Sequence, residues 1–153
     1  MMEVTIMKKV IPMLIIALLL VGCGENKTAL QKPQAQVIDV AGLKWNVIDS
    51  VHIYVSNPRE LSAPNETERL FMVMLHVSNE SDKAIAVSPF DFLLQTDAHN
   101  FYSYTESSLP VTSLDAAELL PEASITGTLT FTIPRNEKPL CLIYEGVDLA
   151  FAN

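Results

Sequence analysis

The chain has few of the residues on which catalytic and metal sites are commonly built. Its 153 residues include two cysteines, three histidines, five glycines and one tryptophan. The five glycines form none of the glycine-rich loops that hold phosphate groups, and the sequence has no nucleophile elbow and no paired catalytic carboxylates. We therefore expect no catalytic residues, no cofactor and no enzymatic activity.

Basic residues are also scarce. Ten lysines and arginines stand against eighteen aspartates and glutamates, which gives a formal net charge of −8 at pH 7. Binding to nucleic acid, or electrostatic binding to anionic lipid, requires clustered lysine and arginine side chains. The composition therefore argues against nucleic acid as a partner and against charge as the means of holding the protein at a membrane.

No apolar run is long enough to span a membrane comfortably, which takes roughly 20 residues. The run Val10–Val21 follows Lys8 and Lys9 and leads directly into the small residues 22–24, after which Glu25 makes the chain polar. A positively charged start, a short apolar segment and small residues at its end are the three parts of a secretory signal peptide. We predict this signal peptide over residues 1–22.

The end of the apolar run, Leu20–Cys23, resembles the lipobox of bacterial lipoproteins. In that family the cysteine thiol receives a diacylglyceryl group and becomes the first residue after cleavage, so the resemblance implies lipidation of Cys23. Two or three acyl chains, at about 0.8 kcal/mol per buried methylene, anchor a protein durably. The resemblance thus implies an extracytoplasmic protein anchored to the cell membrane or outer membrane. The alternative is an ordinary secreted protein cut near Gly22 or Gly24.

The remaining chain divides into a polar segment and one domain. Residues 23–36 show no apolar period after the cysteine and predict a flexible tether, whereas residues 37–153 are long enough for one compact core and too short for two. If Cys23 carries lipid, Cys141 has no partner for an intramolecular disulfide. Because Cys141 lies in an apolar run, we expect it to act as a small hydrophobic side chain, with a reactive thiol as the alternative.

Short runs of branched and aromatic residues, separated by proline, asparagine, aspartate and serine, are typical of a β-protein. One or two strands are expected over Val47–Val55. The other expected strands lie at Arg69–Ser78, Phe90–Leu94, Phe101–Tyr104, Ile125–Ile133, Leu140–Tyr144 and Val147–Phe151. One helical turn is expected at Leu114–Leu119, and a hairpin turn at Asp97–Asn100. About seven strands without intervening helices predict an all-β fold, an antiparallel β-sandwich.

Several positions along these strands match one known group of domains. They are Phe71–Val77, Asn79, Ser81, Asp82, Lys83, Ser88, Pro89, Asp91, Phe92, Leu94, Leu120, Pro121, Gly127, Leu129, Phe131, Pro134, Leu140 and Tyr144. In them the chain resembles the telokin-like, immunoglobulin-fold domains of unknown function found on many bacterial lipoproteins, although Glu122 stands where that group often has glycine. The resemblance implies an immunoglobulin-like sandwich and an envelope location, and it implies no catalytic residues.

Neither the histidines nor the acidic residues show the spacing of a metal site. His52, His76 and His99 lie on different expected elements, with no cysteine or aspartate at ligand spacing, so a zinc or copper site requires the fold to gather them. The acidic residues Asp91, Asp97, Asp115, Glu118 and Glu122 lack the alternation of a calcium loop. We expect surface histidines, a solvated acidic face and no metal.

The candidate binding surface is the second face of the strand Arg69–Ser78. Its residues Leu70, Met72 and Met74 alternate with the Phe71 face, which by the resemblance points into the core. Methionine is adaptable and common on surfaces that bind partners, unless a loop such as Leu109–Leu120 covers it. We predict a non-enzymatic lipoprotein that binds a protein or envelope partner through this face. The alternative is a lipoprotein that carries a small ligand or metal to a transporter.

Overall fold

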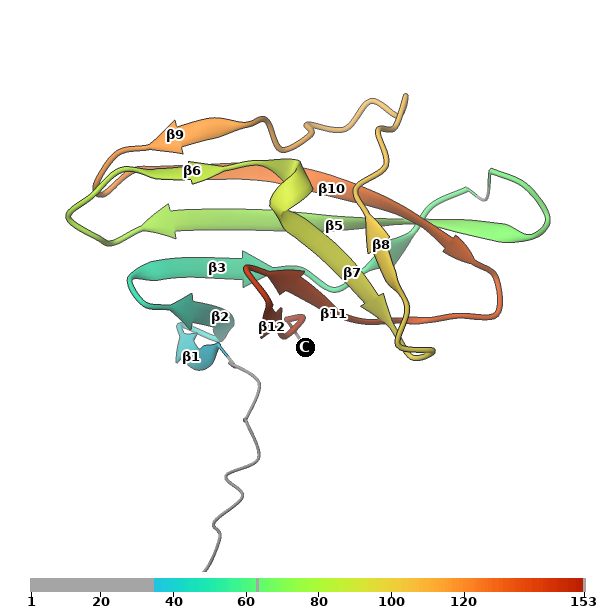
Figure 1. The fold of residues 1–153 in the computed structure, drawn as a ribbon, viewed down its shortest axis with the longest axis horizontal. Coiled ribbons are helices and arrows are strands. Elements are labelled where there is room, and N and C mark those ends of the chain that lie inside the picture. Colours follow the sequence, from blue (N-terminus) through green and yellow to red (C-terminus); the bar gives the residue numbers. More distant parts are fainter. Residues whose placement is uncertain (1–34, 63, 153) are drawn as a thin grey trace, which may run out of the picture. The chain divides into compact units, whose positions relative to one another are not determined.

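The computed structural model describes residues 35–62 and 64–152. The predicted signal peptide, Cys23 and nearly all of the predicted tether lie outside the described residues. The described residues form an antiparallel β-sandwich, which confirms the fold class expected from the strand pattern (Figure 1). The first strand begins at Gln36, the last residue assigned above to the tether.

Within the described residues the larger sheet has six strands in the order β1–β2–β3–β5–β10, and the short β4 pairs beside the first half of β5. Their bounds are β1 Gln36–Val40, β2 Leu43–Ile48, β3 Val51–Val55, β4 Arg59–Glu60, β5 Glu68–Asn79 and β10 Ser124–Pro134. All the pairings are antiparallel. Strands β5 and β10 pair over eleven positions, and β10 is the edge strand at the opposite side of this sheet from β1.

The smaller sheet, again among the described residues, has four strands in the order β12–β11–β7–β8 and lies in front of the larger one in Figure 1. Its strands are β7 Phe92–Thr96, β8 Phe101–Ser103, β11 Pro139–Tyr144 and β12 Val147–Leu149. A further pair, β6 Ile85–Val87 and β9 Ala117–Leu119, forms a separate two-stranded sheet. The predicted turn at Asp97–Asn100 joins β7 to β8 as an antiparallel hairpin.

The core lies between the inner faces of the two large sheets. Phe71, Val73, Leu75 and Val77 of β5 are buried, as the alternation of that strand predicted. They pack in one cluster with Leu129, Phe131 and Ile133 of β10 and with Phe92, Leu94 and Leu142 of the smaller sheet. Burial of this apolar area, at about 25 cal/mol per Å², is the main term that stabilises the sandwich.

Two local predictions are wrong. The helical turn expected at Leu114–Leu119 is extended instead, since Ala117–Leu119 forms β9 and pairs with β6. Phe90 is expected in the strand Phe90–Leu94, but it lies before β7 begins and is 72% exposed. The cause is a single 3₁₀ turn, Pro89–Asp91, in which Ser88 and Asp91 satisfy each other's backbone amides in a capping box. This turn shifts the alternation before β7 begins.

A buried asparagine, Asn46, joins the larger sheet to the end of the chain. The Asn46 side chain, on β2, donates to the carbonyl oxygens of Ile53 (3.3 Å) and Ala150 (3.0 Å) and accepts from the Ala150 amide (2.8 Å). The Ala152 amide then donates to the Val55 oxygen at 2.8 Å. The segment after β12 is thereby joined to the larger sheet.

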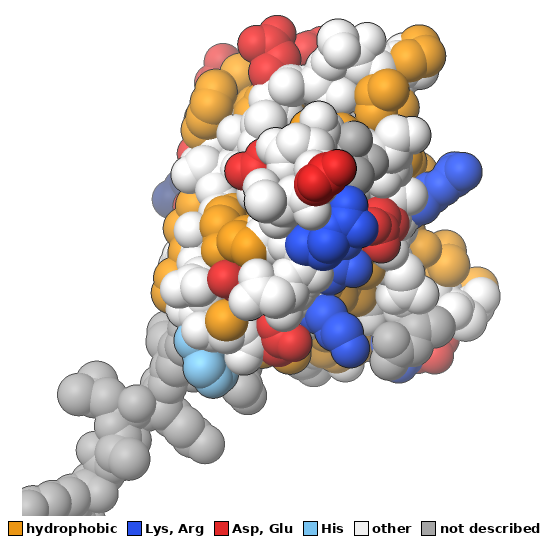
Figure 2. All heavy atoms as spheres, turned by 90° about the vertical axis from the view of Figure 1, so that its right-hand side faces the viewer, with side chains coloured by type: hydrophobic (Ala, Val, Ile, Leu, Met, Phe, Trp, Pro, Cys, Tyr) orange, Lys and Arg blue, Asp and Glu red, His pale blue; other side chains and the backbone are white. Residues whose placement is uncertain are grey.

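Lysine and arginine side chains gather at the end of the domain formed by the β4–β5 loop and the β10–β11 turn, interspersed with acidic groups (Figure 2). Arg69 pairs with Glu60 at 3.3 Å. Arg135 donates from Nε to the backbone oxygen of Glu66 at 2.8 Å. These two cations therefore hold neighbouring segments of the chain together, and the surface here is of mixed sign.

Candidate functional site

The candidate residues Leu70, Met72 and Met74 lie on the face of β5 opposite the core. Leu70 and Met72 are half-buried, whereas Met74 is 41% exposed. The Met74 amide donates to Ser56 Oγ at 2.9 Å, which holds the chain just after β3 beside β5. Of these three side chains, Met74 is the one that a partner reaches without any rearrangement.

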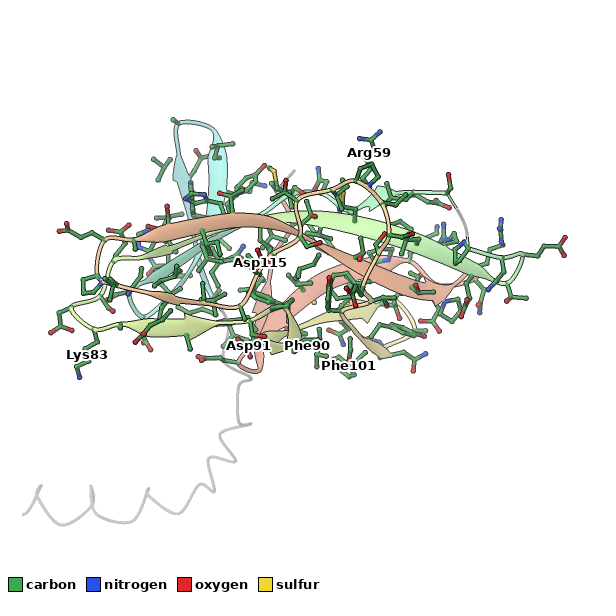
Figure 3. All side chains as sticks on the ribbon, turned by 90° about the horizontal axis from the view of Figure 1, so that it is seen from above. Arg59, Lys83, Phe90, Asp91, Phe101 and Asp115 are labelled. Atoms are coloured by element: carbon green, nitrogen blue, oxygen red, sulfur yellow. The ribbon has the colours of Figure 1, made fainter. Side chains whose placement is uncertain are left out.

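The loop after β8 explains why the Met72 end of this face is less accessible. The Thr105 amide donates to the Thr130 oxygen (2.8 Å), and the Thr128 amide donates to the Thr112 oxygen (2.8 Å), so both ends of the loop lie along β10. Figure 3 shows the loop passing over β10 to the side on which Arg59 projects. Thr130, paired with Met72, is 2% exposed. A covering loop, the alternative considered above, thus exists over part of this face.

The uncovered part of the same face carries a row of aromatic side chains. The strand register places Ile38, Trp45, Tyr54, His76 and Thr126 in line across β1, β2, β3, β5 and β10. Residues paired in this way project from the same side of a sheet. The Trp45 ring lies 5.8 Å from the Tyr54 ring and 5.4 Å from the His76 ring, centroid to centroid. His76 Nδ1 is hydrogen-bonded to Thr126 Oγ1 at 2.6 Å.

Above this row lies a hollow of about 240 Å³. It is lined by Ile38, Val40, Trp45, His52, His76, Ser78 and Glu80. Figure 3 shows the β1–β2 hairpin rising on this side of the sheet, so that it forms one wall of the hollow. On the opposite wall, Ser78 Oγ donates to Glu80 Oε1 at 2.6 Å. We call this the Trp45 hollow.

Sequence reasoning missed Trp45 and Tyr54, although a signal for them was present. In β3, Ile53 and Val55 alternate with His52 and Tyr54, and the apolar pair is buried while the other pair is not. In β2, the same alternation places Trp45 on the face opposite the buried Asn46. Extending the alternation argument from β5 to these strands would have placed both aromatic residues on the outer face.

The fold brings two of the three histidines together. His52 and His76 both line the Trp45 hollow, while His99 lies in the β7–β8 turn with a positive φ of 61°. Across residues 35–62 and 64–152, no group of three or more histidine, cysteine, aspartate or glutamate side chains is placed to hold a metal ion. Two of the acidic candidates have structural contacts, since Asp91 accepts from the Ser88 amide (2.7 Å) and Asp97 from the Lys138 amide (2.9 Å).

A second polar cluster surrounds Glu137, which is only 6% exposed. Its carboxylate accepts hydrogen bonds from Thr96 Oγ1 (2.5 Å), Asn100 Nδ2 (2.8 Å) and the Tyr102 hydroxyl (3.0 Å). The bond from Thr96 is the largest cause that lowers the pKa of Glu137 below its ordinary value. Burial, and then Glu137 itself, raise the pKa of Tyr102. The carboxylate holds the β7–β8 hairpin against the β10–β11 turn.

We expect this cluster to make stability depend on acid. A carboxylate whose pKa is lower in the folded than in the unfolded chain stabilises the fold above the unfolded pKa, ordinarily about 4.5, and that stabilisation is lost as pH falls through the folded pKa. The free energy of unfolding, measured in urea from neutral pH down to about pH 3, should therefore fall more steeply in the native chain than in Glu137→Gln. Parallel pH curves for the two chains would contradict this role.

Cys141 is half-buried, and its Sγ lies 3.3 Å from Gln95 Oε1 on the outer side of the smaller sheet. It is therefore less enclosed than the apolar run around it suggested.

None of the helices that the structure describes is long and apolar enough to cross a membrane.

Comparison with known proteins places this architecture in a family. The family model described as domain of unknown function DUF4352 matches residues 36–151. Among solved structures, ycdA of Bacillus subtilis, a putative lipoprotein, superposes with a TM-score of 0.57 at 15% identity over 70% of this chain and 37% of ycdA. The yjhA protein of B. subtilis gives a TM-score of 0.45 at 14% identity over 74% of this chain and 79% of yjhA.

The chain thus spans little more than a third of ycdA, and the likeness at this identity concerns the fold. A search of curated proteins finds no match. The telokin-like, immunoglobulin kinship stays a prediction, as does lipidation of Cys23.

Proposed function

Because the chain belongs to the DUF4352 family, whose domains have no assigned function, we propose a role from its sequence and geometry. It is a lipid-anchored, extracytoplasmic lipoprotein without enzymatic activity. Its sandwich, which we take to be of the immunoglobulin-like kind, binds a protein or envelope partner through the outer face of the larger sheet. The lipobox-like Leu20–Cys23 supports the anchor, and the description of ycdA as a lipoprotein fits the same location.

The observation that carries the binding role is that three exposed apolar side chains share this face with two aromatic ones. Val40 and Leu43, paired at the tip of the β1–β2 hairpin, are 53% and 47% exposed, and Met74 is 41% exposed. The register places all three on the same side of the sheet as Trp45 and Tyr54. Aromatic residues and methionine are enriched where proteins bind partners. The core occupies the other face of the sheet, so this face is the one available for binding.

Crosslinking in intact cells, followed by mass spectrometry of the captured proteins, tests this proposal. We expect Met74→Asp to lower capture of a discrete partner about tenfold or more, since a charge placed in an apolar contact costs at least about 1.4 kcal/mol. Met74 is preferred to Met72 because Met72 is half-buried beside the covered part of the face. Leu120→Asp is the matched control, because Leu120 is an exposed apolar residue outside this face.

Equal capture by the native chain and Met74→Asp would refute the binding face, as would an equal loss in Leu120→Asp.

The same cells test the anchor. Cys23→Ser should move the protein out of the membrane fraction, whereas Cys141→Ser, which alters the other cysteine, should leave it there. Membrane retention of Cys23→Ser would refute lipid anchoring.

A further inference from the structure

We propose that the Trp45 hollow binds a small organic cation of the quaternary-ammonium class, for which choline and tetramethylammonium are the probes. The hollow opens on the outer face of the larger sheet, so this inference deepens the proposed function by naming a ligand chemistry for that face. It rests on three properties of the hollow, namely its aromatic floor, its charge and its size.

The aromatic floor is already in place without a ligand. Trp45 packs against both Tyr54 and His76, with ring centroids 5.8 and 5.4 Å away, and His76 is in turn held by Thr126. A cation over the face of a tryptophan ring is attracted by the ring quadrupole, and tryptophan attracts it more strongly than tyrosine or phenylalanine does. Because the rings are fixed by their mutual packing, little side-chain entropy is lost when a ligand binds.

The charge of the hollow selects a cation. Its lining includes the carboxylate of Glu80 and no lysine or arginine. The formal charge of the chain, −8 at pH 7, adds a field of the same sign. An anionic ligand would meet repulsion from Glu80 with nothing to offset it.

Two side chains of the hollow already form hydrogen bonds within the protein, which disfavours a sugar, the other ligand that aromatic side chains often bind in an envelope. Ser78 Oγ already donates to Glu80, and His76 Nδ1 is already bonded to Thr126. A sugar needs several free donors and acceptors, because its hydroxyl groups lose their bonds to water on binding. A quaternary ammonium group needs none, since it has no N–H to satisfy.

Size sets the last limit. The hollow measures about 240 Å³, below the roughly 300–1,000 Å³ of sites that enclose drug-sized ligands. It therefore fits a head group or a small free amine. Both sources present the same chemistry, so the experiment includes an arm for each.

Trp45 is the only tryptophan of the chain, so intrinsic tryptophan fluorescence reports on this hollow alone. The full-length chain, in a choline-free non-ionic detergent, is titrated with tetramethylammonium and with choline. The neutral control is 3,3-dimethylbutanol, which has the shape of choline without the charge. We expect a saturable fluorescence change with both cations and none with the neutral compound at equal concentration. A flat titration, or an equal response to the neutral compound, would overturn the proposal.

Two variants locate the response. Glu80→Gln keeps an acceptor for Ser78 but removes the charge, and should raise the Kd for choline about fivefold, as loss of an exposed charge contact implies. Glu118→Gln removes an exposed carboxylate from β9, outside the hollow, and should leave the Kd unchanged. An unchanged Kd in Glu80→Gln, or equal losses in both variants, would refute the assignment.

Vesicles of phosphatidylcholine and of phosphatidylglycerol then separate the two sources. A response to free choline and to phosphatidylcholine identifies a lipid head group as an accessible ligand, whereas a response to free choline alone identifies a soluble amine. Partner capture by Met74 is measured in a different assay. Failure of the titration with capture intact therefore removes only the ligand class, and the reverse result removes only the protein partner.

Discussion

Phe131→Ala is expected to lower the free energy of unfolding by about 3–5 kcal/mol, the usual cost of emptying a buried phenylalanine site. Phe131 is fully buried in β10 and pairs with Phe71 of β5, on the core-facing side of the larger sheet. Its neighbours in the core come from both sheets. Because β10 is paired with β5 over eleven positions and the Thr105 amide bonds to the Thr130 oxygen on its other side, the backbone is held and the cavity can close only partly.

The measurement is urea unfolding of the native chain and the variant, compared at equal m-value. Phe101→Ala is the matched control, since Phe101 lies on β8 with its side chain mostly exposed. That substitution should cost no more than about 0.5 kcal/mol. If Phe131→Ala cost as little as Phe101→Ala, the packing described for the two sheets would be incorrect.

Gly127→Ala is expected to destabilise the fold by about 3 kcal/mol, at the upper end of the usual cost of overpacking. A Cβ atom at position 127 would lie 2.4 Å from Leu114 Cα and 2.6 Å from Leu114 N. These are backbone atoms, so no side-chain rotation relieves the overlap. The segment 112–114 would have to leave β10, taking the buried Leu114 side chain out of the core.

The exchange rates of backbone amide hydrogens show where the substitution disrupts the structure. The amides of Leu114 and Thr128 bond across this contact, to the Thr128 and Thr112 oxygens at 3.0 and 2.8 Å. Both should exchange faster in Gly127→Ala. Ser124→Ala, at the exposed start of the same strand, should leave them protected. Unchanged protection in Gly127→Ala would show that the segment is not held where the structure places it.

The long strands could be predicted because each has one buried face. The predicted Arg69–Ser78 is β5 Glu68–Asn79, and the predicted Ile125–Ile133 is β10 Ser124–Pro134. In both, apolar residues recur at every second position, which is the period of a strand. The short strand β9 was mistaken for a helical turn because three residues are too few to show a period.

The cluster around Glu137 and the Trp45 hollow could not be predicted in the same way. Glu137 lies in a turn whose sequence indicates a solvated side chain, yet its carboxylate is bonded to side chains 35 to 41 residues earlier. The Trp45 hollow depends on β1, β2, β3 and β5 lying in one register. Alternation along one strand shows which side a residue faces, and strand register decides what lies beside it.

The strand that begins the domain also determines how the domain resists a mechanical pull. β1 is an edge strand, paired with β2 alone from Gln36 opposite Val47 to Val40 opposite Leu43. Traction on the chain ahead of Gln36, away from the sheet, reaches the ladder at one end, so its bonds break in succession rather than together. The bonds of Asn46 to Ile53 and Ala150 tie β2 to β3 and to the segment after β12. Separation should therefore stop at β2. Under a pull, β1 would detach while the remaining strands stay folded.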